Sequence, residues 1–114
     1  MTDKVNPLKL NALQLRTLTV LQALARSGAA SLNQDGTEAT IRGLPSPHGD
    51  HVHIGDAVVR TADMSGLSRE PVWNALARKG LARSEWPQAI TLTAAGLLYM
   101  TGLDDEILHG HAGH

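Results

Sequence analysis

The sequence predicts one α+β domain that is mainly α, and three observations support this fold class. The 114 residues suffice for a single domain. Hydrophobic residues make up 42% of the chain, as in most globular proteins, but aromatic residues make up only 3% and Phe is absent. The core is therefore expected to consist of Leu, Ala, Val and Ile, a composition that favours helix. Short segments in which apolar and polar residues alternate add strands to these helices.

The first helix begins after Asn11, which is a good N-cap residue, and Gln14 completes a capping-box pattern three residues later. Apolar residues then recur at helical spacing until Gly28, which is expected to stop the helix. The following segment is small and polar and ends in a turn cluster rich in Pro. On either side of this cluster, residues 37–44 and 51–54 alternate between apolar and polar, so we expect them to pair as a hairpin.

Two short helices are expected next. Asp56 is a candidate N-cap for a helix over about 57–65, and Gly66 is expected to end that helix. Ser68 is a candidate N-cap for a helix over about 69–79, since Ser is a preferred N-cap residue. Pro71 lies in the first turn of that helix, where a missing N–H costs little.

A second hairpin is predicted over about 81–93, since two alternating segments flank a Pro-Gln turn. Thr93 is a candidate cap for a final helix that extends to Gly102. The remaining residues, 103–114, form an acidic and histidine-rich tail. Residues 104–106 are expected to begin one more helical turn, and the end of the tail is expected to be loose.

The order of these elements resembles a winged helix-turn-helix, in which two helices joined by a tight turn precede a hairpin called the wing. Gly80-Leu81 at the start of the hairpin and Leu92-Thr93-Ala94-Ala95-Gly96 at its end resemble motifs of the MarR-type transcriptional regulators. The long flanking helices with which those regulators dimerise have no counterpart here. We expect a single domain over 1–102, in which the resemblance assigns the helix-turn-helix to about 56–80 and the wing to about 81–93. The extra β-hairpin insert at about 37–54, before the second helix, has no counterpart in a minimal winged helix.

The resemblance implies a transcriptional regulator that binds double-stranded DNA as a homodimer, with the helix at about 69–79 in the major groove. With Val72 and Leu76 on the inner face of that helix, we expect Arg69 to pair with a guanine and Asn74 with an adenine. The candidate DNA-binding residues are Arg60, Ser68, Arg69, Trp73, Asn74, Arg78, Lys79 and Arg83. The alternative for Trp73 is a place in the core, which is otherwise short of aromatic rings.

The overall charge of −1 does not by itself indicate a nucleic-acid partner. The charges are unevenly spread, however, because residues 57–83 hold five basic and two acidic residues, whereas residues 84–114 hold four acidic residues and no Lys or Arg. A winged helix that contacts another protein instead of DNA therefore stays open as an alternative. The hairpin at about 37–54 is a candidate surface for such a partner.

Three of the six histidines lie close together in the insert. His51 and His53 are expected on one face of a strand, roughly 7 Å apart along it. A Zn²⁺ or Ni²⁺ ion bound by His48, His51 and His53 would make the protein a metal-responsive regulator. The alternative is that these imidazoles line a solvated strand face without a metal.

Several classes of protein are not indicated. No Gly-rich phosphate-binding loop, His-Glu-x-x-His motif or nucleophile elbow is present, so we do not expect an enzyme. No apolar run approaches the roughly 20 residues of a membrane span, and the N-terminus lacks a signal-peptide pattern. Together with the absence of Cys, these features predict a cytoplasmic protein without a membrane partner.

Overall fold

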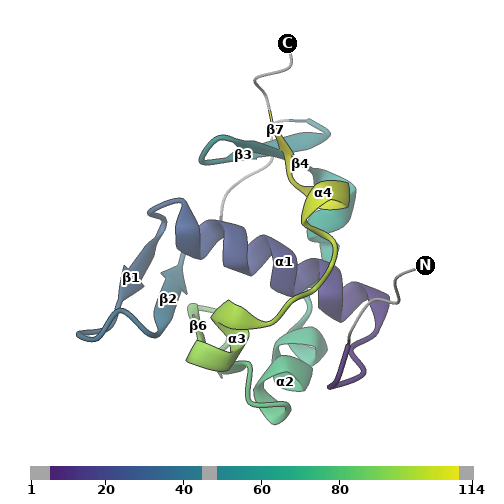
Figure 1. The fold of residues 1–114 in the computed structure, drawn as a ribbon. Helices are drawn as coiled ribbons and strands as arrows, with labels where there is room; N and C mark the ends of the chain where they lie inside the picture. Colours follow the sequence, from purple (N-terminus) through teal and green to yellow (C-terminus); the bar gives the residue numbers. More distant parts are fainter. Residues whose placement is uncertain (1–5, 45–48, 111–114) are drawn as a thin grey trace.

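The computed structural model describes residues 6–44 and 49–110, which form two antiparallel sheets and several helices (Figure 1). The longest helix, α1 (Ala12–Arg26), crosses the middle of the molecule. The other helices are the 3-10 helix η1 (Thr61–Ser68), α2 (Glu70–Arg78), α3 (Ala94–Leu98) and α4 (Asp104–Ile107). The strands are β1 (Ala30–Leu32), β2 (Ala39–Arg42), β3 (His51–Ile54), β4 (Ala57–Arg60), β5 (Ala82–Glu85), β6 (Ala89–Leu92) and β7 (His109–Gly110).

The capping box predicted for α1 is confirmed. The backbone N–H of Gln14 donates to Asn11 Oδ1 at 2.8 Å, and the N–H of Asn11 donates to Gln14 Oε1 at 3.0 Å. Gly28 follows the C-cap with a φ of 90°, a conformation that favours glycine. Every residue from Thr17 to Leu24 is buried, so the wide apolar stripe of this helix is covered by the chain itself.

The larger sheet has the strand order β1-β2-β6-β5 and joins the segment after α1 to the hairpin after α2. Its centre is the pair β2 and β6, in which Ile41 lies opposite Ile90 and both side chains are buried. The hairpin β5–β6 forms where the sequence predicts it. Thr93 caps α3 as expected, because its Oγ1 accepts a hydrogen bond from the Gly96 N–H at 3.2 Å. The helix ends at Leu98, however, and not at Gly102.

The prediction of an inserted hairpin at about 37–54 is wrong, although both of its strands exist. β2 pairs with β1 and β6, whereas β3 pairs with β4 in a second sheet of order β3-β4-β7. The turn between β3 and β4 contains Gly55, at a φ of 58°, and Asp56, so Asp56 is not the N-cap of a helix. In the strand that follows, Val58 and Val59 are β-branched residues that favour a strand.

The predicted fold class, mainly α with an extra β-hairpin insert before the second helix, is wrong. The described residues form seven strands in two sheets, and the helix expected over about 57–65 is replaced by β4 and η1. Ser68 does not cap α2, because Arg69 occupies the N-cap position and the Ser68 hydroxyl donates to the Ser65 carbonyl oxygen at 3.2 Å. The chain is an α+β protein that is not mainly α.

The core lies between α1, α2 and the sheets. Its largest fully buried side chains include Trp73, Leu18, Leu21, Ile41, Leu76, Leu81, Ile90 and Leu92. Buried polar side chains of α1 bind the C-terminal segment: Gln22 Nε2 donates to the carbonyl oxygens of Gly96 and Tyr99, both at 2.8 Å. Thr19 Oγ1 lies 2.6 Å from Thr101 Oγ1 in the same region. These hydrogen bonds satisfy polar groups that water does not reach.

Gly66 of η1 packs directly against Thr17 of α1. A Cβ atom at Gly66 would lie 1.9 Å from Thr17 Oγ1, which is buried and has no hydrogen-bond partner among the described residues. We expect Gly66→Ala to lower the free energy of unfolding by about 1–3 kcal/mol through overpacking. Thr17→Ala removes the clashing oxygen, so the double variant should recover part of the loss. Urea unfolding of the wild type, both single variants and the double variant measures this coupling, and strictly additive effects would contradict it.

Candidate nucleic-acid interface

The helix α2 has one buried face and one exposed face. Its buried residues are Val72, Trp73, Ala75 and Leu76. On the opposite side, Glu70, Asn74 and Arg78 are exposed and follow one another at intervals of four residues, so they form a stripe along the helix. We call these three residues the α2 stripe. A partner can reach α2 along this stripe and at the N-terminal end, where Ser68 and Arg69 are exposed.

Arg69 and Arg78 have free guanidinium groups. Both residues are exposed, and within residues 6–44 and 49–110 neither guanidinium makes an ion pair or a hydrogen bond. The amide of Asn74 is likewise exposed and makes no hydrogen bond in that part of the chain. These three side chains can therefore bind a partner without first breaking contacts inside the protein.

Trp73 belongs to the core, since only 1% of it is exposed. Its Nε1 donates to the Leu67 carbonyl oxygen at 3.1 Å, and its ring meets Trp86 edge to face with ring centroids 4.7 Å apart. The prediction that Trp73 contacts DNA is therefore wrong. In a chain with few aromatic residues, this indole fixes η1, α2 and the hairpin turn to one another.

Two of the residues expected to bind phosphates, Lys79 and Arg83, bind other groups of the same chain. Lys79 Nζ donates to the Leu8 carbonyl oxygen at 2.8 Å. Arg83 binds Glu38 through two hydrogen bonds, from Nη1 to Oε2 at 2.9 Å and from Nη2 to Oε1 at 2.5 Å. The hydrogen bonds from Arg83 lower the pKa of Glu38, and the same bonds raise the pKa of Arg83. These bonds hold both cations in place and leave fewer of their donors for a phosphate.

Arg60 lies away from α2. Its Nε donates to Asp63 Oδ2 at 3.2 Å, and it borders a surface pocket together with Arg16 of α1 and Glu106 of α4. The structure therefore separates Arg60 from the other candidates. The candidates that remain exposed at α2 are Ser68, Arg69, Asn74 and Arg78.

The turn of the hairpin β5–β6 carries no cation. Only Trp86, Pro87 and Gln88 connect the two strands, and the bond between Trp86 and Pro87 is cis. Pro87 and Gln88 are exposed, as is the acidic Glu85 at the end of β5. The turn itself therefore offers no positive charge to a phosphate backbone, and the cation of the predicted wing, Arg83 on β5, is paired with Glu38.

Among the described residues, the histidines His51, His53 and His109 lie on the second sheet, outside this interface. His51 and His53 are neighbours on β3, with ring centroids 5.1 Å apart. His109 lies on the same face, because His53 and His109 are both paired with Val58 of β4. The sequence did not indicate this position, since β7 has only two residues and shows no periodicity.

The predicted zinc or nickel site is not assembled by the described part of the chain. Within it, no group of three or more potential ligands is placed to hold a metal ion. His48, the third expected ligand beside His51 and His53, lies outside the described residues.

Comparison with family models, with curated proteins and with solved structures finds no match for this chain. In residues 6–44 and 49–110, no helix is long and apolar enough to cross a membrane. The interpretation of the candidate interface therefore rests on its own geometry.

The pair of Glu38 and Arg83 predicts a pH dependence of stability. The pKa of Glu38 is lowered from its ordinary value of 4.5 in the folded state. The stabilisation of the folded state by the pair of Glu38 and Arg83 is therefore complete above pH 4.5, and it is lost as the pH falls through the lowered folded-state pKa of Glu38. We expect Glu38→Gln to melt below the wild type at neutral pH and together with it in strong acid. Thermal unfolding across the acidic range measures this, with Glu70→Gln as a control for the loss of one carboxylate, and a constant difference at every pH would contradict it.

Proposed function

We propose that this protein binds double-stranded DNA through α2 and acts as a transcriptional regulator in the cytoplasm. The observation that carries the proposal is the exposed Asn74 on α2, flanked along the chain by Arg69 and Arg78, whose guanidinium groups make no ion pair or hydrogen bond in the described part of the chain. In the major groove, Asn pairs with adenine and Arg with guanine, each through two hydrogen bonds. Arg69 lies at the N-terminal end of α2, the end with which recognition helices contact base edges.

The packing beneath α2 supports the proposal, because a helix that distinguishes base pairs must be held in a fixed orientation. Trp73 and Leu76 anchor α2 in the core, and the bond from the Trp73 indole to Leu67 fixes the helix relative to η1. β5 begins at Ala82 and packs against the same helix. The resemblance to MarR-type regulators stays a prediction that no comparison tests.

A protein partner is the second candidate, and the state of the neighbouring cations favours it. Lys79 and Arg83 are occupied, and Glu70 adds an acid to the α2 stripe, so the positive charge at α2 is modest. In this case the α2 stripe would bind an acidic surface of another protein. The hairpin expected to bind such a partner at 37–54 does not form, which leaves α2 as the better surface for this contact as well.

Removal of the two free arginines should abolish most of the DNA affinity. Duplexes selected from a random-sequence pool serve as ligands, and fluorescence anisotropy at several salt concentrations gives the dissociation constant. If each of the two guanidinium groups neutralises one phosphate charge as α2 enters the groove, the slope of log K against log salt should be roughly −2 for each protomer, and it should approach zero in the Arg69→Ala, Arg78→Ala variant.

Arg60→Ala is the matched control, because it removes one positive charge from β4, away from α2. It should change neither the affinity nor the slope. If the wild type fails to bind DNA even at low salt, or if Arg60→Ala costs as much as the paired substitution, the proposal is overturned.

Asn74 tests base recognition separately from charge. Asn74→Ala should weaken binding to a selected duplex by about 1–3 kcal/mol and leave binding to a random duplex unchanged. Gln88→Ala removes an exposed amide from the hairpin turn and serves as the control. Equal losses on selected and random duplexes would show that Asn74 does not distinguish base pairs.

A further inference from the structure

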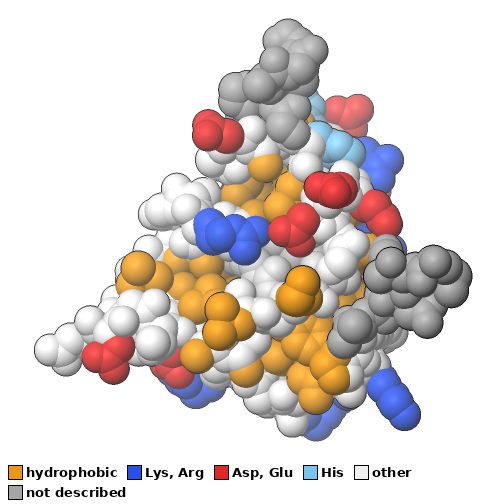
Figure 2. All heavy atoms as spheres, in the orientation of Figure 1, with side chains coloured by type: hydrophobic (Ala, Val, Ile, Leu, Met, Phe, Trp, Pro, Cys, Tyr) orange, Lys and Arg blue, Asp and Glu red, His pale blue; other side chains and the backbone are white. Residues whose placement is uncertain are grey.

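Two large hydrophobic side chains stand exposed at the end of α3. Leu98 is 78% exposed and Met100 is 81% exposed, and the only other exposed large hydrophobic side chain among the described residues is Leu32. Figure 2 shows hydrophobic side chains gathered over α3 and the segment that follows it. Pro7 and Ala95 line a shallow hollow together with Leu98 and Met100. We call these four residues the α3 ridge, because Leu98 and Met100 stand exposed at its edge. Contiguous apolar surface is a common feature of sites that contact other molecules.

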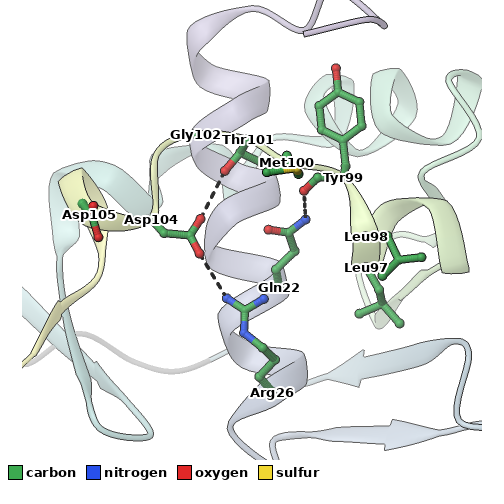
Figure 3. Close-up of a pocket in the computed structure, with 10 residues that line it drawn as sticks. All are labelled: Gln22, Arg26, Leu97, Leu98, Tyr99, Met100, Thr101, Gly102, Asp104 and Asp105. Carbon is green, nitrogen blue, oxygen red and sulfur yellow. Dashed lines mark hydrogen bonds and ion pairs between the residues drawn. The ribbon is translucent and has the colours of Figure 1, made fainter. Parts of the chain in front are cut away.

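A groove lies next to the α3 ridge, between α1, α3 and α4 (Figure 3). Leu98 and Met100 belong to its lining, so ridge and groove share one face of the molecule. The volume of the groove is about 410 Å³. Since a cavity of about 150 Å³ takes a benzene-sized group, the groove has room for two aliphatic side chains.

Hydrogen bonds hold the backbone of the α3 ridge in place. Gln22 Nε2 donates to the Tyr99 carbonyl oxygen at 2.8 Å. The Tyr99 hydroxyl donates to Asn6 Oδ1 at 2.5 Å and accepts from the Leu8 N–H at 3.2 Å. The residue between Leu98 and Met100 is thereby fixed on both its backbone and its side chain. Binding through the ridge consequently costs little additional backbone entropy.

The rim of the groove carries both signs of charge. Arg26 Nη2 lies 3.6 Å from Asp104 Oδ2, and the two side chains are 54% and 55% exposed. Asp105 also lines the groove and makes no ion pair or hydrogen bond within the described ranges. One cation and two carboxylates, one of them unpaired, thus border an apolar surface. Such a surface is complementary to itself, because the cation of one copy can meet the unpaired acid of another.

We propose that a second copy of this chain docks on the α3 ridge about a two-fold axis. In this arrangement the ridge of each copy enters the groove of the other, and Arg26 of each copy pairs with the partner's Asp105. The α3 ridge, the groove, Arg26 and Asp105 all lie on one face of one chain, which is the requirement for an isologous dimer. None of these residues belongs to the α2 stripe, so the proposal does not rest on DNA binding.

Sedimentation equilibrium of the 114-residue chain without DNA tests the dimer. We expect a mass of twice 12.1 kDa. Leu98→Glu and Met100→Glu should each raise the dimer dissociation constant by about tenfold or more. Leu32→Glu places the same charge on the exposed leucine of β1 and should leave the dimer intact.

All three substituted side chains are exposed, so the circular dichroism spectra of the variants should match the wild type and separate loss of association from loss of folding. A monomeric wild type would overturn the proposal. A dimer that the two ridge substitutions leave as strong as before would overturn it as well.

A charge exchange tests the pairing across the axis. Arg26→Glu and Asp105→Arg should each weaken the dimer, whereas the double variant should associate more tightly than either single variant. The recovery is expected because the exchanged charges again face each other between the two copies. No recovery would show that Arg26 and Asp105 do not meet in the dimer. The measurement contains no DNA, so its outcome is independent of the test of the α2 stripe.

Discussion

The burial of α1 is the constraint on which the rest of the structure depends. Residues Thr17–Leu24 are all buried, so other elements must cover the helix on every side, and η1, α2, α3, α4 and β2 pack against it. The polar side chains on the buried part of this helix cannot form hydrogen bonds with water. Gln22 and Thr19 instead bond to the segment that follows β6. The hydrogen bonds that complete the core therefore also set the position of the α3 ridge.

Folding changes which charges at α2 are available to a partner. Lys79 and Arg83 look like free cations in the sequence, but their partners are Leu8 and Glu38, which lie 71 and 45 residues away along the chain. No local pattern contains these contacts, because they arise only when α1 and β2 bring distant segments beside α2 and β5. The positive charge that remains is small, so the proposed recognition of DNA at α2 would depend on the amide of Asn74 more than the charge of the segment suggests.

Elements marked by a local signal could be predicted from the sequence. The capping box of α1 is one such signal, and the Pro-Gln turn of the hairpin β5–β6 is another. The wrong predictions concern which strands pair with each other. An alternating segment indicates a strand but not its neighbour, and β2 pairs with β6, about 50 residues later, rather than with β3.

Helical periodicity also does not place the side chains at the edge of a helix face. Trp73 adjoins the buried Val72, and its place in the core is secured by Trp86, which approaches from the hairpin turn. His109 is a similar case, since its place beside His53 follows from the pairing of β7 with β4. In both cases the decisive neighbour lies in another element, so helical or strand periodicity alone does not identify it.

The contact between Trp73 and Trp86 also makes the molecule optically informative. These are the two tryptophans of the chain, and their rings stand at 85° with centroids 4.7 Å apart, so their electronic transitions couple. Near-ultraviolet circular dichroism of this pair reports on the junction of α2 with the hairpin. The one tyrosine of the chain, Tyr99, lies beside Leu98 and Met100 instead. Each of the two proposed surfaces thus has its own natural chromophore, and spectra taken without any added dye can distinguish a ligand at one from a ligand at the other.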